Sequence, residues 1–393
     1  MRQRYATLAD AVKAVEKGTT ATPTTITLLK KQNISSLMVG HQYAQNIIVD
    51  LNGYTLSSSA IVLTAYRSGT TLEVKNGTIS GNSTSGTLRA TYGGKLVLKQ
   101  STNVNNKVNV TASVGRTYFG SLADAIEFAK AGDTVTLIRD INLTAEDLGE
   151  KHDGYNTFFN ISGKSITIDL NGKTIYGENT RTNTHNFLID VNGGTLTASN
   201  GTIAMKHTGS NMGWNGATTV IDVTANGTLN LNGVTVQNQG GTDMNFAVHM
   251  NNWGEVTLNA DNCVFDALYC GVRVFNSGYD MNNVKITNSK LTGSTRAFWV
   301  HNYLGDLDSS KHSDEAIKAR LILDIYGNNN TFEITGTATA PIRYGFGDTV
   351  YFNAEGSQVI DTAEDLQDAI NNGSGDITLG GDIDLGNGSI VIP

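Results

Sequence analysis

The sequence predicts an all-β solenoid, a stack of short strands joined by tight corners. One phrase occurs twice, as IIVDLNGYTL at residues 47–56 and as ITIDLNGKTI at residues 166–175. Its alternating apolar residues predict strands with one buried face, and its Asn-Gly pair predicts a corner because both residues tolerate a positive φ. Shorter copies recur every ~20–30 residues, which is typical of a solenoid. These copies lie at residues 72–79, 196–203, 229–236, 256–265 and 284–291.

The composition supports the all-β class and limits the kinds of binding partner that we expect. The 393 residues include 43 Gly and 3 Pro, and 16% are charged, which suits neither a disordered chain nor a helical bundle. The net charge of −8 comes without a long basic run, so we expect neither nucleic acid nor an anionic membrane surface as a partner. Because no stretch approaches the ~20 apolar residues of a membrane-spanning helix, we expect no membrane insertion.

The N-terminal residues, MRQRY, lack the apolar segment of a signal peptide. Two origins are compatible with this start. Met1 was added to a domain excised from a longer secreted protein, or the protein is a virion component that is released when its host cell lyses. We therefore expect an extracellular, cell-surface or virion-surface location.

The two cysteines, Cys263 and Cys270, are too few for a disulfide framework. Cys263 stands where Val234 stands one repeat earlier, which favours a buried thiol over a disulfide between the two cysteines. In the same repeats we expect a continuous apolar core that contains Val234, Val248, Val272 and Ile286.

Three segments predict short helices that open units of the solenoid. Residues 7–12 (TLADAV) match residues 121–126 (SLADAI) and, less closely, residues 365–370 (DLQDAI). Each begins with a residue suited to an N-cap and carries an acidic residue three positions later. Such a helix covers the end of the solenoid core. The expected N-caps are Thr7, Ser121 and Asp365.

These helices divide the chain into tandem units. We expect a first capped unit at residues 1–112 and a second, longer one at residues 113–353. Residues 354–393 are too short for a stable stack, so they are either the start of a third unit, in a natural chain that continues past Pro393, or a closing cap on the second.

The cap helix followed by GDTVTL at residues 132–137 and IDLNGKTI at residues 168–175 resembles the pectin-lyase-like right-handed parallel β-helix domains of bacterial surface proteins and phage tail and virion proteins. The resemblance implies tandem right-handed parallel β-helix units, each opened by a short capping helix. It leaves the function open, because this fold carries lyases, hydrolases, adhesins and viral spikes. Since trimers are common among phage β-helices, a homotrimer is one option that the resemblance implies.

Stacking of the rungs predicts two columns of outward side chains, because equivalent residues of successive rungs lie ~4.8 Å apart. The middle residues of the strands near residues 187–191, 220–223, 247–250, 271–274 and 298–300 should point toward solvent, because their neighbours are apolar. The first column is Asp190, Asp222, His249, Arg273 and Trp299, with Arg343 as an extension. The second column is Asn192, Thr224, Asn251, Phe275 and His301, beside Asn252, Asn276 and Asn302.

This face has two interpretations. As a binding face, it suits a glycan or cell-surface ligand, because aromatic faces stack on sugar rings and Asn, Asp and Arg bind hydroxyls. As a structural ladder, Asp222, His249 and Arg273 simply compensate one another's charge. The candidate ligand-binding residues are Asp190, Asp222, His249, Asn251, Arg273, Phe275, Trp299 and His301.

An enzyme is the less favoured alternative. A polysaccharide lyase or glycoside hydrolase acting on this face needs a base or a set of carboxylates, and the column offers only Asp190 and Asp222. We therefore assign no catalytic residue, metal or cofactor. A further acidic cluster in the loop at residues 304–318 lacks regular ligand spacing and indicates a solvated loop. It contains Asp306, Asp308, Asp314 and Glu315.

The sequence thus favours a non-catalytic β-helix module that recognises a surface, with glycan as the expected ligand and other virion or surface proteins as further partners. A purely structural protein, such as a phage tail or capsid component or a cell-surface spacer, is the second alternative to an enzyme. The sequence names neither the ligand nor the source.

Overall fold

The computed structural model is a β-solenoid of about 8 turns with parallel sheets, and its 55% strand and 9% helix confirm the all-β class and the parallel β-helix. The residues that the structure describes are 3–15, 21–81, 86–105, 108–147, 156–180, 185–208, 218–240, 244–251, 255–276, 283–302, 325–326, 328–338, 340–344, 350–352, 358–360, 362–371, 377–379, 382–386 and 388–392.

The chain divides into two compact units. Unit 1 contains residues 1–140 and 166–173, and unit 2 contains residues 141–165 and 174–393. The three domain ranges read from the sequence stay a prediction. Within the described residues, no helix is long and apolar enough to cross a membrane.

Unit 1 begins with a triangular stack in which each rung contributes one strand to each of three parallel sets. Apolar residues alternate along these strands and fill the interior, and helix α1 (Leu8–Lys13) packs its buried face against the same core. The three sets are β1 (Thr24–Thr27), β4 (Asn46–Asp50), β7 (Thr71–Lys75) and β10 (Lys95–Leu98); β2 (Gln32–Asn33), β5 (Thr55–Ser58), β8 (Gly77–Gly81) and β11 (Thr102–Asn105); and β3 (Leu37–Val39), β6 (Leu63–Tyr66), β9 (Leu88–Thr91) and β12 (Val108–Asn109).

Unit 1 then changes strand direction before its second helix. Strand β13 (Ala112–Val114) pairs antiparallel with both β14 (Thr117–Phe119) and β15 (Thr134–Leu137), and β15 pairs parallel with β18 (Ser165–Asp169). Helix α2 (Leu122–Phe128) lies between β14 and β15 in the chain, where the sequence predicts a helix, and buries Leu122, Ala125 and Ile126.

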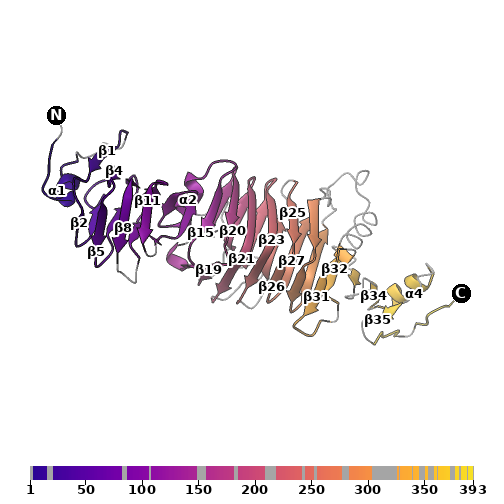
Figure 1. Ribbon diagram of the computed structural model, residues 1–393. Helices are drawn as coiled ribbons and strands as arrows, with labels where there is room; N and C mark the ends of the chain where they lie inside the picture. The colour runs from indigo at the N-terminus through magenta and orange to yellow at the C-terminus, as the bar shows by residue number, and fades with distance from the viewer. Residues whose placement is uncertain are drawn as a thin grey trace. The chain divides into compact units, whose positions relative to one another are not determined.

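Unit 2 is a stack of longer rungs, whose strands lie side by side in Figure 1. One face pairs parallel from β17 to β32 and continues through three short strands: β17 (Asn156–Ser162), β20 (Asn186–Asn192), β22 (Thr218–Thr224), β24 (Asn245–Asn251), β27 (Cys270–Asn276), β30 (Arg296–Asn302), β32 (Ile342–Tyr344), β33 (Val350–Phe352), β34 (Gln358–Ile360) and β35 (Thr378–Leu379). The other strands are β16 (Ile141–Leu143), β19 (Thr174–Asn179), β21 (Thr195–His207), β23 (Thr228–Asn238), β25 (Thr257–Asp261), β26 (Val264–Ala267), β28 (Val284–Thr287), β29 (Lys290–Gly293) and β31 (Thr331–Ile334), with a 3₁₀ turn η1 (Ala145–Asp147).

The predicted core and corners are confirmed. Val234, Val248, Val272 and Ile286 are each no more than 1% exposed, and both cysteines are buried and free. The corner asparagines adopt left-handed backbones, with φ of 50° at Asn52 and 52° at Asn171.

The helix caps are confirmed in two of three places. The side chains of Thr7 and Ser121 accept hydrogen bonds from the main-chain N–H groups of the residues three positions later. The third prediction was wrong, because Asp365 lies inside helix α4 (Ala363–Asn371) and not before it. The helical bond from the N–H of Leu366 to the oxygen of Thr362 shows that the first turn already forms at Thr362.

Candidate functional site

The first predicted column exists as an unbroken row across neighbouring strands of unit 2. The register puts Asp190 of β20 opposite Asp222 of β22, Asp222 opposite His249 of β24, and His249 opposite Arg273 of β27. It continues from Arg273 to Trp299 of β30 and from Trp299 to Arg343 of β32.

The expectation that this column faces solvent is wrong. Asp190, Asp222 and Arg273 are each 2% exposed and Trp299 is 4% exposed. The side chain of His249 keeps 14% of its surface.

The burial of Arg273 and Trp299 follows from an apolar cluster beside the column. Phe246, Cys270 and Trp299 pack together, with Met244 and Tyr269 against them. The ring of Phe246 stacks on the imidazole of His249 with centroids 5.5 Å apart. Aromatic side chains from neighbouring positions therefore contact His249 and Arg273, where the sequence predicted contact with solvent.

Three members of the column form a hydrogen-bonded chain. Nδ1 of His249 lies 2.8 Å from Oδ1 of Asp222, and Nη1 of Arg273 lies 2.6 Å from Nε2 of His249. Because a guanidinium only donates, Nε2 must accept, and the ring proton therefore sits on Nδ1 and is donated to Asp222. His249 is thus a neutral bridge between a carboxyl and a guanidinium.

Burial shifts the ionisation of these groups. It raises the pKa of Asp222 to about 8, although the charge of Arg273 opposes the shift. Burial, and then the charge of Arg273, lower the pKa of His249 well below 6.5. Burial is also the main cause that raises the pKa of Cys270 to about 12 and lowers that of His185 to about 4.

Trp299 lies between two guanidinium groups. The Cζ atoms of Arg273 and Arg343 each lie 4.8 Å from the centre of its ring. Arg273 also lies 5.5 Å from the ring centre of Phe246 and 5.2 Å from that of Phe275. These are cation–π contacts, which stabilise most where water is excluded.

Only some residues of the second predicted column lie opposite one another in the described structure. Asn192 is opposite Thr224, and Asn251 is opposite Phe275, and these four side chains are partly buried. The main chain of His301 is opposite Phe275, while its side chain lies outside the described part of the structure, as do those of Asn276 and Asn302. Asn252 lies outside the described residues.

The acidic residues form no metal site in the described part of the chain, where no group of three or more His, Cys, Asp or Glu side chains could hold an ion. The expected acidic loop lies outside the described residues. This applies to Asp306, Asp308, Asp314 and Glu315.

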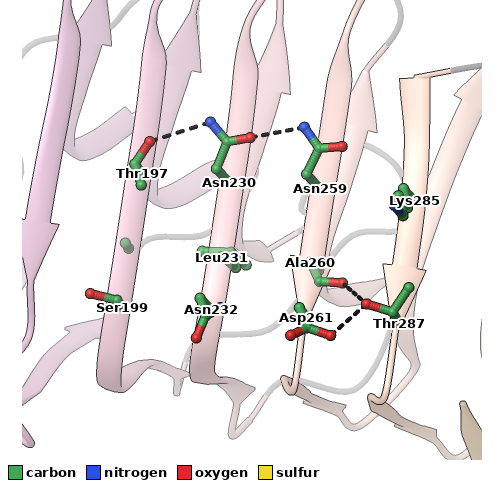
Figure 2. Close-up of a pocket in the computed structure, with 11 residues that line it drawn as sticks. Thr197, Ser199, Asn230, Leu231, Asn232, Asn259, Ala260, Asp261, Lys285 and Thr287 are labelled. Atoms are coloured by element: carbon green, nitrogen blue, oxygen red, sulfur yellow. Dashed lines mark hydrogen bonds between the residues drawn. The ribbon is translucent and has the colours of Figure 1, made fainter. Parts of the chain in front are cut away.

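A groove that the sequence reading missed lies on another face of unit 2. It has a volume of about 490 Å³ and crosses the strands β21, β23, β25 and β28. Figure 2 shows two rows of side chains along it, two residues apart on each strand. One row is Thr197, Asn230, Asn259 and Lys285, and the other is Ser199, Asn232, Asp261 and Thr287.

The first row is a hydrogen-bonded ladder, and its bonds do not use every donor and acceptor of its amides. Nδ2 of Asn230 donates to Oγ1 of Thr197 at 3.3 Å, and Nδ2 of Asn259 donates to Oδ1 of Asn230 at 2.9 Å. A primary amide has two N–H groups and two acceptor lone pairs, and these two bonds use one of each at Asn230. Asn259 and Lys285 are exposed.

The second row holds a fixed negative charge. Asp261 accepts from Oγ1 of Thr287 at 2.5 Å and from Nδ2 of Asn288 at 2.7 Å. These bonds, with a smaller effect of Lys285, lower the pKa of Asp261. The groove thus offers hydroxyls, amides, one oriented carboxylate and one ammonium group.

The signal for this groove was present in the sequence. Aligning the shorter copies of the phrase puts Thr197 above Asn230 and Ser199 above Asn232 as outward residues. Outward Thr, Asn and Lys are common throughout this chain, so residue type alone did not separate these rows from ordinary solvated positions. No family model, curated protein or solved structure matches this chain.

Proposed function

We propose that this chain is a non-catalytic recognition protein that binds a glycan in the groove across β21, β23, β25 and β28. The observation that carries the proposal is the open volume of about 490 Å³ between two polar rows on a stack of parallel strands. Four strands at a spacing of ~4.8 Å give a groove about 14 Å long, enough for several sugar residues.

The chemistry of the rows suits sugar hydroxyls. A hydroxyl donates one hydrogen bond and accepts others, so it pairs equally well with amides, carboxylates and ammonium groups. Asp261 and Lys285 supply charged partners, whose hydrogen bonds are stronger than neutral ones. Because β-strands fix the main chain that carries these side chains, little backbone entropy is lost when a ligand binds.

The buried column supports this proposal only indirectly. Its carboxyl and guanidinium groups are already bridged by His249, and Asp222 and Arg273 are 2% exposed. A polysaccharide lyase or hydrolase using this column would need a rearrangement before a substrate reached Asp222, because that side chain is buried. We therefore give the column the structural role that was its alternative interpretation, and we place recognition in the groove.

A structural virion or cell-surface protein is the second candidate. The favouring observation is the ladder from Thr197 through Asn230 to Asn259, since cross-strand side-chain bonds of this kind also stabilise a sheet that binds nothing. The two candidates differ in what they predict for ligand binding.

The test uses the double variant Asn259→Ala/Lys285→Ala. Both side chains are exposed, so the fold should survive, which circular dichroism would check. Binding to a glycan array and to presumptive host cells should weaken at least about tenfold, which corresponds to about 1.4 kcal/mol. Gln237→Ala/Lys206→Ala is the matched control, because it also removes one amide and one lysine outside the groove.

Control and parent should bind equally. A folded groove variant that binds as well as the parent would exclude the groove. A parent that binds neither glycans nor cells would favour the structural candidate.

A further inference from the structure

A short row of aromatic rings lies on unit 1, whereas the proposed function uses residues of unit 2. The ring centroid of Tyr66 lies 5.6 Å from that of His41 and 4.9 Å from that of Tyr92, with interplanar angles of 52° and 51°. Tyr92 is 71% exposed and His41 is exposed, while Tyr66 is partly buried. We call these three residues the aromatic ladder.

The parallel strands of one sheet position the ladder. Val39 of β3 is opposite Ala65 of β6, and Tyr66 of β6 is opposite Thr91 of β9. Tyr66 is the last residue of β6, and Tyr92 follows the last residue of β9 directly. The rings therefore gather where three consecutive strands end.

The backbone under the ladder is unusual for this chain. Tyr92 has a φ of 50° and Arg67 has a φ of 66°. At most other left-handed positions without glycine the chain has asparagine, which tolerates this conformation, whereas a bulky side chain there is strained. A tyrosine that is both strained and 71% exposed serves neither the turn nor the core, which points to a role at the surface.

The ladder is held in place from below. A Cβ atom on Gly94 would lie 2.3 Å from the main-chain oxygen of Ala65, so the turn after Tyr92 packs directly on the preceding rung. The guanidinium of Arg67 donates to the main-chain oxygens of His41, at 2.7 Å, and Gln42, at 3.0 Å. The loop that carries His41 is thus tied to the next rung, and the main chain that carries the rings is pre-organised for binding.

From this geometry we propose that the aromatic ladder is a second ligand site, one that binds the C–H face of a pyranose ring in a glycan. The quadrupole of an aromatic ring makes its face partially negative, and the C–H groups of a sugar face are partially positive, so the two attract while apolar surface is buried. A cationic ligand is disfavoured because the guanidinium of Arg67 binds in the same loop. The site does not depend on the groove of unit 2.

The test compares three variants by saturation-transfer NMR and titration. The probes are hexasaccharides of β-1,4-linked glucose, α-1,4-linked glucose and β-1,4-linked N-acetylglucosamine. Tyr92→Asn removes the ring but keeps a residue that tolerates the left-handed turn, so its stability should match or exceed that of the parent. Tyr92→Phe keeps the ring. Tyr54→Asn removes another exposed tyrosine of unit 1 outside the ladder.

We expect the parent, Tyr92→Phe and Tyr54→Asn to bind at least one probe alike, and Tyr92→Asn to bind it at least fivefold more weakly. Equal binding by a folded Tyr92→Asn variant, or no binding of any probe by the parent, would overturn the proposal. The groove variant Asn259→Ala/Lys285→Ala separates the two sites. Probe binding that only the groove variant weakens would overturn the ladder and keep the groove, whereas binding that only Tyr92→Asn weakens supports the ladder alone.

Discussion

His249 provides hydrogen-bond partners for two buried ionisable side chains, Asp222 and Arg273. A buried carboxyl or guanidinium without a partner costs several kcal/mol. The imidazole donates to Asp222 through one nitrogen and accepts from Arg273 through the other. One neutral ring therefore satisfies polar groups on both adjacent strands, and the three side chains act as a unit.

The carboxyl of Asp222 should give folding a distinct pH dependence. Its pKa is 3.8 in ordinary surroundings and about 8 in the fold. Across that window the folded chain keeps a proton that the unfolded chain releases, so stability falls as the pH rises. His249 and His185, whose pKa values burial lowers, act in the opposite sense, but only below pH 6.5.

We therefore expect the melting temperature to fall between pH 6.5 and pH 8, where these histidines no longer offset the carboxyl. The unfolding free energy should change by up to about 1.4 kcal/mol per pH unit. Asp222→Asn cannot ionise and should show a shallower slope in scanning calorimetry. A parent without this slope, or a variant that keeps it, would contradict the raised pKa.

The sequence predicted which residues of the column meet but not how deeply they are buried. Apolar neighbours such as Val248 and Met250 fix the register, because a shift by one residue would turn them outward. The cover comes from Phe246 and Tyr269, which belong to different rungs. Contacts between side chains of this kind have no signature in the spacing of a single strand.

Corners set the size and shape of each rung. In the corner between β18 and β19, Asn171 has a φ of 52°, and its Nδ2 donates to the oxygen of Leu137 on the preceding rung at 3.1 Å. Its own N–H donates to Oδ1 of Asp169 at 3.0 Å. Asn52 repeats this arrangement with Asp50 and Leu28. The repeated phrase of the sequence is thus a repeated corner.

Replacing Asn171 should show how much a corner contributes. Asn171→Ala loses both the side-chain bond and the tolerance of a left-handed backbone, so it should cost about 1–3 kcal/mol. Asn171→Gly loses only the bond and should cost less. Urea denaturation of the two variants beside the parent measures the difference. If Ala proved as stable as Gly, the backbone conformation would not be the reason for asparagine here.

Elements were predictable where one local rule applied. Thr7 and Ser121 satisfy the N-cap rule and do cap helices. Asp365 satisfies it as well, but the preceding Ala363 favours a helix and the turn starts earlier. The groove escaped notice because it depends on four strands at once, and no single strand marks it.

Each unit has contacts that are local in the chain, as expected of a solenoid. The apolar core cluster of unit 1 lies between Leu8 and Val110. In unit 2, Val272 of β27 is opposite Val248 of β24 and Phe298 of β30, and all three are fully buried. Periodicity of apolar residues was therefore sufficient to predict the fold class, whereas the function depends on a few polar side chains that any such fold can vary.

Val272→Asp should unfold unit 2 and leave the core of unit 1 folded. It puts an unpaired charge into a fully buried position, which costs several kcal/mol. Hydrogen exchange measured by mass spectrometry should lose protection over residues 187–300 and keep it over residues 47–98. The substitution Val272→Ile, which stays apolar, is the control. Loss of protection in both ranges would show one cooperative fold, and an unchanged melting temperature would contradict the register.

The Asn-Gly corners, whose asparagines have a left-handed backbone, also affect how fast this protein deamidates. Asparagine before glycine is prone to deamidation, in which the glycine nitrogen attacks the side-chain carbonyl, ammonia leaves, and water opens the resulting five-membered imide to isoaspartate or aspartate. Here the N–H of Gly53 donates to the oxygen of Asn76 at 2.6 Å, and that of Gly77 donates to the oxygen of Ser101 at 3.0 Å. Folding therefore occupies the attacking nitrogen at both corners. A chain that spends time unfolded gains isoaspartate there, and because isoaspartate lengthens the main chain by one carbon, the damaged corner no longer fits between its rungs.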